Sequence, residues 1–527
     1  MRMIGSLPSF RFSRSPGLTF IAFVGVLCLA YEAAQLILEG DTTSLIMYGF
    51  VFVGLAVVVA ILNDWRRGLY LLLTWIVFED LVRKYLGNNM AIFFVKDVLA
   101  LVVYLSFFIS KRAGRARIFK PPFLFPLLLF LWYGVIQVFN PVSTSVFYGL
   151  MGMKIDFLYV PLMFIGYGLI ERDEDLRRFF AYNSLLVLTV VGLGIAQAVL
   201  GHTFLNPAVM QEDIRSLSST YRGAPISSVL AYRPNSVFVS AGRMQDFLLI
   251  SWLVALGFAG YLLLRSKKNR LLAFLTVGVV GVGSIMSTSR SVFLYTASSV
   301  LVIIVAFLWG SPWRQGEARR TVRAIMRGAM FAAVALFLMM TFLPDQVASR
   351  FAIYNETLSP YSPASELAFR ARDYPWRNFM LAFQHEHWIF GYGIGTSSLG
   401  VQYVTRIMHA PLMVIGVENG YGQLVVEMGI PGLLLWIVLS VAVSLSAWKV
   451  VVKLKGTPWF PIGFVIFWYA FLLMIPISFY GFVAYQDFIM NAYLWTLLGI
   501  LFRLPTLAQE EIRAQVTAQQ ALAARQA

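Results

Sequence analysis

A succession of long apolar segments constrains the fold of this chain more than any other feature. A helix of about twenty apolar residues is long enough to cross a bilayer. Apolar runs of that length lie at 18–38, 43–62, 68–86, 92–109, 122–139, 145–170, 178–200, 244–264, 271–287, 291–309, 326–343, 430–450, 461–482 and 487–503. Only 13% of the residues are charged, about half the fraction found in soluble proteins. The sequence therefore predicts an all-α, polytopic membrane protein with about 12–14 transmembrane helices and a helical loop region outside the membrane.

The distribution of basic residues predicts how these helices are oriented. Junctions on the cytoplasmic side of a membrane protein carry an excess of lysine and arginine. Basic clusters occur at alternate junctions, namely 64–67, 111–117, 265–270, 314–327 and 449–455. Both termini are then expected in the cytoplasm. We interpret residues 1–527 as a single integral membrane domain with a cytoplasmic tail at 508–527. Two long loops, 202–243 and 344–429, are expected on the outer side.

Several classes of function do not fit this composition. The net charge of +16 is accounted for by the positive cytoplasmic junctions, and no aromatic-basic module for nucleic acid is present. The single cysteine, Cys28, excludes an intramolecular disulfide and a thiolate metal site. His385 and His387 flank Glu386, but this spacing matches no usual zinc pattern. We therefore expect no metal, no cofactor and no nucleic-acid partner.

The two outer loops contain arginine but no lysine. Their arginines are Arg215, Arg222, Arg233, Arg243, Arg350, Arg370, Arg372, Arg377 and Arg406. Arg290 lies in Ser287-Thr-Ser-Arg-Ser291, at the expected boundary between membrane and outer side. A planar guanidinium binds phosphate or carboxylate with two hydrogen bonds, whereas lysine acts as a point charge. The set predicts an anion site, although any one arginine could instead pair with a loop acid such as Glu356 or Glu366.

Charged residues also occur inside the predicted membrane segments. They are Glu79, Asp80, Lys96, Asp97, Lys154 and Asp156. Because charges in a bilayer are costly, they are expected to face a polar interior. We favour structural ion pairs, for example Lys96 or Lys154 with Glu79 or Asp80.

Four segments, in order, resemble the O-antigen ligase and polysaccharide polymerase superfamily of bacterial inner-membrane glycosyltransferases. Arg233-Pro-Asn-Ser-Val-Phe-Val239 precedes a mid-chain span, and Thr288-Ser-Arg-Ser291 resembles the family's Ser-Arg turn. The segment Arg372–Phe383, followed by Trp388–Gly395, resembles its large periplasmic loop. Asn419–Gly432 resembles the segment that leads into the last spans.

The resemblance implies a metal-independent glycosyltransferase at the periplasmic face. Such enzymes transfer a glycan from an undecaprenyl-pyrophosphate carrier to a sugar hydroxyl, with loop arginines on the pyrophosphate. They commonly use a histidine directly before the asparagine of the last motif as base. Here Glu418 precedes Asn419, and the nearest histidine is His409. This departure favours an exopolysaccharide-type polymerase over a ligase. Implied partners are the lipid-linked glycan, membrane lipids and proteins of polysaccharide export or chain-length control.

These observations give a specific site hypothesis. The expected catalytic residues are Glu418, Arg290 and His409. The expected substrate-binding residues are Arg233, Arg243, Arg370, Arg372, Arg377, Asn419 and Tyr421. Glu418 could instead help cap the following helix, and His409 could be an ordinary loop histidine. The glycines of Gly391-Tyr-Gly-Ile-Gly395 could cradle phosphate or simply form a turn. The alternative functions are an O-antigen ligase and a flippase for lipid-linked oligosaccharides.

Overall fold

The computed structural model describes residues 42–526. Gaps in this description fall at 88–89, 115, 209, 211, 266–267, 311, 313–329, 331–333, 335–336, 399–400, 402–403 and 406–415. The chain divides into two compact units, residues 1–68 and 69–527. Helix α2 (Thr42–Asn63) belongs to the first unit, and the second unit carries the remaining features discussed below. The expectation of one membrane domain over the whole chain stays a prediction.

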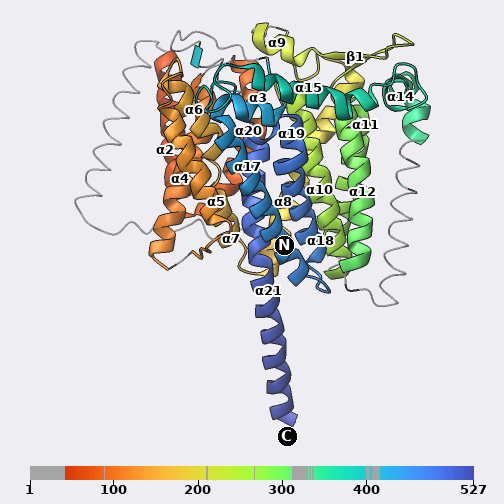
Figure 1. The fold of residues 1–527 in the computed structure, drawn as a ribbon. Coiled ribbons are helices and arrows are strands. Elements are labelled where there is room, and N and C mark those ends of the chain that lie inside the picture. Colours follow the sequence, from red (N-terminus) through yellow and green to blue (C-terminus); the bar gives the residue numbers. More distant parts are fainter. Residues whose placement is uncertain are drawn as a thin grey trace. The chain divides into compact units, whose positions relative to one another are not determined.

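The described residues are predominantly helical, and the all-α polytopic class is confirmed (Figure 1). Eight helical segments among them are long and apolar enough to cross a membrane: 91–112, 146–169, 173–200, 241–265, 290–310, 420–453, 460–480 and 488–511. Shorter apolar helices occur at 53–63, 124–138 and 270–286. The predicted span 18–38 and half of the predicted span 326–343 lie outside the described residues.

Most predicted spans coincide with a single helix. These are α3 (Trp65–Leu86), α4 (Met90–Arg112), α5 (Leu124–Val138), α8 (Asp173–Leu200), α10 (Ala241–Arg265), α11 (Arg270–Met286), α12 (Arg290–Gly310) and α21 (Phe488–Gln526). Two predicted spans are interrupted. The span 145–170 consists of α6 (Val146–Phe157) and α7 (Leu162–Leu169). The span 461–482 consists of α18 (Phe460–Leu472), a π-helical turn that contains Pro476, and α19 (Ser478–Tyr480). Proline lacks the backbone N–H that a regular α-helix needs at this position.

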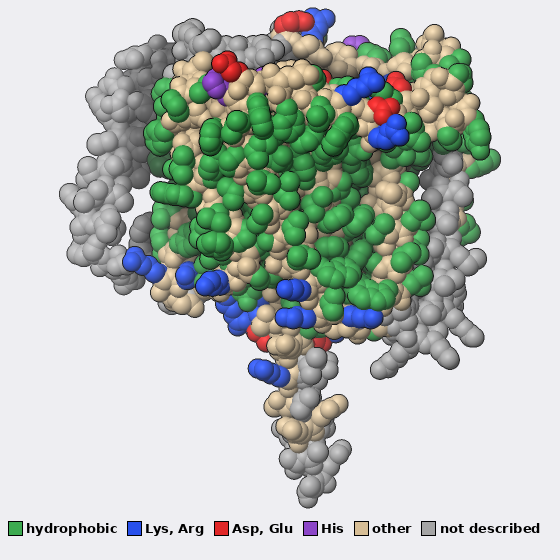
Figure 2. All heavy atoms as spheres, in the orientation of Figure 1, with side chains coloured by type: hydrophobic (Ala, Val, Ile, Leu, Met, Phe, Trp, Pro, Cys, Tyr) green, Lys and Arg blue, Asp and Glu red, His purple; other side chains and the backbone are tan. Residues whose placement is uncertain are grey.

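One face of the second unit, here called the tail face, gathers helix ends around α21. Glu510 of α21 accepts hydrogen bonds from Arg117 (3.0 Å) and Arg503 (2.8 Å). Glu511 pairs with Arg265 at the end of α10. At 1.5 Å per residue, the 39 residues of α21 span about 58 Å, and the helix projects beyond the other helices (Figure 1). On the surface seen in Figure 2, lysine and arginine side chains line the edge of the apolar band on this side.

The opposite face, here called the loop face, carries the two long loops (Figure 1). The first contains α9 (Glu212–Ser218) and a hairpin of β1 (Tyr221–Gly223) and β2 (Leu230–Tyr232), in which Arg222 lies opposite Ala231. The second contains α14 (Pro344–Leu358), the π-helical turn η1 (Phe369–Asp373) and α15 (Tyr374–Leu381). A helical loop region was expected, so the hairpin is a difference from the prediction. Strands of three residues are too short to give an alternating hydrophobic pattern.

Helix α17 (Gly420–Lys453) begins inside the predicted loop and is broken at Gly429, where φ is 69°. A Cβ atom on Gly429 would lie 2.1 Å from the carbonyl oxygen of Ile389. The backbone of 389–393 joins the helix at this break, since Tyr392 N donates to Val426 O (2.8 Å) and Gly393 N to Glu427 O (2.9 Å). Because these amides already have acceptors, the structure accounts for the glycines through a tight turn (φ 79°, 103° and 87° at Gly391, Gly393 and Gly395).

Candidate functional site

The Ser-Arg turn brings Arg290 to the loop face as the first residue of α12. Thr288 has a φ of 54°, a conformation that is unusual for a β-branched residue and indicates local strain. Ser289 stabilises the helix start, because its Oγ accepts from Val292 N (3.4 Å). A helix N-terminus carries a partial positive charge and does not favour an arginine there. The helix N-terminus and the positive charge of Arg290 together favour an anion at this position.

Arg222 and Arg233 of the hairpin segment lie beside Arg290. Arg222 Nη1 donates to Thr288 O in the Ser-Arg turn (3.2 Å). Burial lowers the pKa of Arg222 to about 10, and the nearby charges of Arg233 and Arg290 contribute to that shift. The pKa of Arg233 is also lowered, first by burial and then by Arg290. Arg233 Nε is buried, and none of the described residues accepts a hydrogen bond from it. Three guanidinium groups therefore converge, and one of them has a buried N–H without an acceptor.

Helix α14 holds these arginines in place through two side chains. Arg350 is fully buried and donates to the carbonyl oxygens of Met286 (3.1 Å), Gln346 (2.6 Å), Ala198 (3.4 Å) and Tyr232 (3.5 Å). Tyr232 directly precedes Arg233, and Met286 lies four residues before Arg290. Tyr354 OH donates to the carbonyl oxygen of Ile285 (3.0 Å). One helix thus fixes both backbone segments that carry the converging arginines.

A chain of polar contacts leads from Arg290 to Glu418. Glu366 Oε2 accepts from Arg290 Nη1 (2.7 Å) and from Arg370 Nε (3.1 Å). The Arg370 guanidinium lies 4.9 Å from the centre of the Tyr374 ring. Tyr374 OH donates to Glu418 Oε2, and this hydrogen bond is the main reason why the pKa of Tyr374 is raised. A continuous series of contacts therefore joins the arginine cluster to Glu418, the predicted base.

The charge of this cluster is not balanced by the described residues around it. The cluster contains five positive charges and one negative charge, that of Glu366. The positive charges are those of Arg222, Arg233, Arg290, Arg350 and Arg370. Like charges at short range in a partly buried site repel one another unless an anion lies between them. The cluster is therefore suited to a ligand with more than one negative charge.

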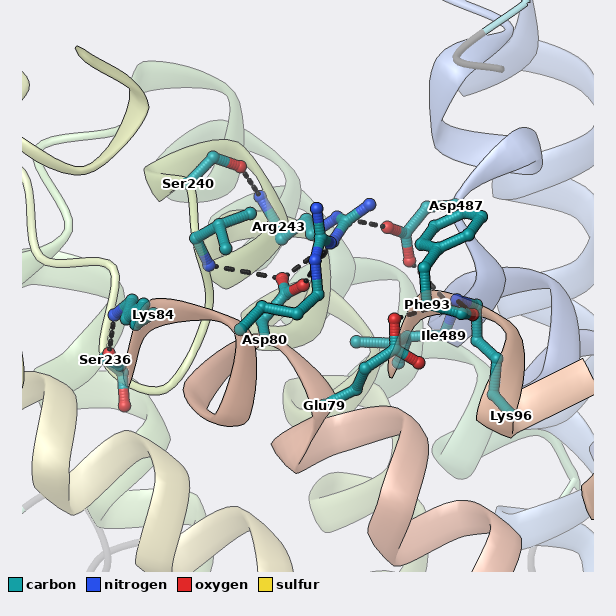
Figure 3. Close-up of polar contacts among 12 residues, drawn as sticks. Glu79, Asp80, Lys84, Phe93, Lys96, Ser236, Ser240, Arg243, Asp487 and Ile489 are labelled. Atoms are coloured by element: carbon teal, nitrogen blue, oxygen red, sulfur yellow. Dashed lines mark hydrogen bonds and ion pairs between the residues drawn. The ribbon is translucent and has the colours of Figure 1, made fainter. Parts of the chain in front are cut away.

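A second cluster, of which Figure 3 shows the part around Asp80 and Arg243, is electrically balanced. Arg243 donates to both carboxylate oxygens of Asp80 (2.7 Å each) and lies 3.3 Å from Asp487. Asp80 is 1% exposed and also pairs with Arg83 (3.0 Å). The predicted pairing of Lys96 with Glu79 is confirmed at 2.8 Å, and Lys154 pairs with Asp97 at 2.6 Å. The cluster joins five acids, Glu79, Asp80, Asp97, Asp246 and Asp487, to five bases, Arg83, Lys84, Lys96, Lys154 and Arg243. Arg243 thus lies among carboxylates, and these contacts are those of a structural ion pair.

The other predicted site residues have varied positions. Arg372 is 88% exposed and pairs with Asp373 (2.9 Å), and Arg377 is exposed on α15. Asn419 is the N-cap of α17, because its Oδ1 accepts from Gly422 N (2.9 Å). This assigns the capping role considered for Glu418 to its neighbour. Tyr421 OH lies 3.4 Å from the carbonyl oxygen of Ile475. His409 is outside the described residues.

Four members of the site were not singled out from the sequence, namely Arg222, Arg350, Glu366 and Tyr374. Arg222 and Arg350 are two of the nine loop arginines, with nothing in the sequence to distinguish them, and Tyr374 is one of several aromatic residues in the second loop. Glu366 is one of the loop acids that could pair with an arginine. Its position four residues before Arg370 was a usable signal, since residues at that spacing meet on one side of a helix.

Comparisons with known proteins support one family assignment. A search of curated proteins finds no match. Residues 275–437 match the family described as O-antigen ligase (Wzy_C). The matched segment starts in α11 and ends in α17, and it contains Arg290, Glu366, Arg370, Tyr374 and Glu418. The resemblance seen in the sequence is thereby confirmed for three of its four segments, because residues 275–437, less than half of the chain, match an O-antigen ligase domain.

Proposed function

We propose that the protein is a polymerase that joins lipid-pyrophosphate-linked oligosaccharide units into an exopolysaccharide or O-antigen. The observation that carries this proposal is the unbalanced positive charge where Arg222, Arg233 and Arg290 meet. Arginine clusters of this kind suit a pyrophosphate, which offers several oxygen acceptors and at least two negative charges. The donor's lipid would remain in the bilayer beside the helices.

In the proposed reaction, the leaving group is stabilised at one end of the site and the acceptor is deprotonated at the other. The bond between the sugar's anomeric carbon and the pyrophosphate oxygen breaks, and its electron pair leaves with the lipid pyrophosphate. Arg222, Arg233 and Arg290 stabilise the negative charge that grows on this leaving group. Glu418 accepts the proton of the acceptor hydroxyl, whose oxygen forms the new bond to the anomeric carbon. Tyr374 orients the Glu418 carboxylate through its hydrogen bond. The arginines supply the positive charge, so the proposed reaction needs no metal ion.

The proposed reaction occurs on the loop face, which we assign to the periplasmic side of a bacterial inner membrane. The basic ends of α4, α10 and α17 support this orientation, since Lys111, Arg112, Arg265 and Lys453 lie in their last turns. The tail face, with the C-terminus of α21, is then cytoplasmic. Proteins of polysaccharide export and chain-length control are the proposed partners on the periplasmic side.

The test uses purified protein in nanodiscs with its lipid-pyrophosphate-linked oligosaccharide and EDTA. We expect longer glycan chains to form as free lipid pyrophosphate appears, and we expect Arg290→Gln to abolish both. Arg215→Gln, an exposed arginine of α9 outside the cluster, is the matched control and should keep activity. Transfer of a single unit to a different acceptor would instead identify a ligase. An intact donor that crosses the membrane only when the protein is present would identify a transporter and overturn the proposal.

A further inference from the structure

Glu366 is the only acid in contact with the arginine cluster among the described residues. One of its carboxylate oxygens, Oε2, accepts from both Arg290 (2.7 Å) and Arg370 (3.1 Å). Carboxylate and phosphate oxygens use the same guanidinium donors with similar geometry. A phosphate that binds Arg290 from this side must therefore compete with Glu366 for the same N–H group.

Glu366 is held loosely enough to be displaced. Its side chain is 39% exposed and that of Arg290 is 19% exposed, and partly exposed pairs contribute little to stability. It follows a partly exposed connection from Ser359 to Ser365, in which Tyr361 is 95% exposed. The base of this connection is closed by a hydrogen bond from Glu366 N to Thr357 O (3.1 Å). The carboxylate can therefore leave Arg290 without disrupting α14 or α12.

We propose that Glu366 is an internal competitor that makes the site selective for diphosphate over monophosphate. This inference rests on the proposed function, because it concerns the same anion site. A monophosphate that displaces Glu366 from Arg290 gains only the contacts that the carboxylate gives up. The displaced carboxylate remains nearby, and its negative charge repels the monophosphate. The second phosphate group of a diphosphate is available to Arg222 and Arg233. Neither donates a hydrogen bond to Glu366 among the described residues, although the charge of Glu366 acts on Arg222 at longer range. The extra contacts offset the loss of the Glu366 pair only for the doubly phosphorylated group.

The experiment measures anion binding directly. Wild-type and Glu366→Gln proteins in nanodiscs are titrated calorimetrically with inorganic phosphate and with inorganic pyrophosphate, both in EDTA. Glutamine keeps the size of the side chain and removes its charge. We expect phosphate to bind about tenfold more tightly to the variant, which corresponds to about 1.4 kcal/mol, the lower range for a charge-assisted hydrogen bond. Pyrophosphate should gain less, so the preference for pyrophosphate over phosphate should fall.

Asp373→Asn is the matched control. Asp373 is 38% exposed, close to the 39% of Glu366, but it pairs with the outlying Arg372. It should leave both affinities unchanged. Unchanged or weaker phosphate binding in Glu366→Gln, with pyrophosphate still bound through Arg290, would overturn this inference alone. If the wild type does not bind pyrophosphate more tightly than Arg290→Gln does, the anion site itself is wrong, and the proposed function fails with it.

Discussion

Replacing Arg350 by methionine tests whether α14 organises the arginine cluster. Methionine fills similar apolar space but donates no hydrogen bond, so the carbonyl oxygens of Met286 and Tyr232 lose their buried donor. A buried polar group without a partner costs about 1–3 kcal/mol. The contact to Met286 at 3.1 Å is well formed, whereas those to Ala198 and Tyr232, at 3.4 and 3.5 Å, are weak. We therefore expect a local loss of about 2–4 kcal/mol.

Hydrogen exchange measured by mass spectrometry can detect this loss in the two segments concerned. At about 1.4 kcal/mol per factor of ten, the amides of the hairpin and of the turn before α12 should exchange roughly thirty to several hundred times faster. Arg350→Lys, which keeps a charge but not the fork of donors, should give an intermediate rate. Arg215→Met, at an exposed position, should leave the rates unchanged. Wild-type exchange rates in Arg350→Met, in both segments, would refute this account of α14.

Four further predictions follow from the same contacts. Glu418→Gln should slow glycan transfer by a factor of about 10²–10⁴, while the affinity for pyrophosphate, measured by titration, stays the same. A wild-type rate of transfer would show that Glu418 is not the base. Arg243→Gln should lower the amount of folded protein, seen as lost monodisperse material on size exclusion. Buried Asp80 then keeps Arg83 but loses both hydrogen bonds from Arg243, and breaking a buried ion pair costs about 3–5 kcal/mol. Normal yield with lost pyrophosphate binding would show that Arg243 acts on the ligand. Gly429→Ala should lower the thermal unfolding temperature, because its Cβ would lie 2.1 Å from a backbone oxygen. An unchanged unfolding temperature would argue against the break in helix α17 at this residue. Burial alone would raise the pKa of Glu366, but Arg370 and Arg290 hold it below its usual 4.5. Its ion pairs therefore stabilise the loop above about pH 4.5 and are lost as pH falls through the lowered pKa. The protection factors at 359–370, which correct for the pH dependence of intrinsic amide exchange, should fall over that range in the wild type and stay constant in Glu366→Gln.

The apolar spans were predictable because the thickness of a bilayer fixes how long an apolar helix must be. The interruptions were not located, although their residues were visible. Pro476 lies within an apolar run, and Gly429 and Pro431 lie in a motif that was recognised but not interpreted as a helix break. Hydropathy averages over about twenty residues, so it cannot resolve a break of one residue.

The site was predicted in outline, from the position of Arg290 and Arg233 at one membrane boundary. Arg243 was included for the same reason, yet its carboxylate partner Asp80 lies 163 residues earlier. Nothing local to the sequence identifies that pair. The contact between Arg290 and Glu366 spans 76 residues and depends on how the second loop folds back over the Ser-Arg turn. Short-range pairs such as Glu366 with Arg370 are readable from spacing, whereas pairs between distant segments require the fold.

The join between residues 389–393 and the broken helix α17 has a consequence for the order of synthesis. Gln137 and Asn140, near the end of α5, donate to the carbonyl oxygens of Phe390 and Gly391 (2.9 and 3.1 Å). These donors leave the ribosome about 250 residues before their acceptors do. The acceptor segment, in turn, is not complete until Val426 and Glu427 have emerged. A nascent chain that stops before α17 would therefore contain every arginine of the cluster but no finished loop face, and the late helices act as the final assembly step of a site encoded mostly upstream.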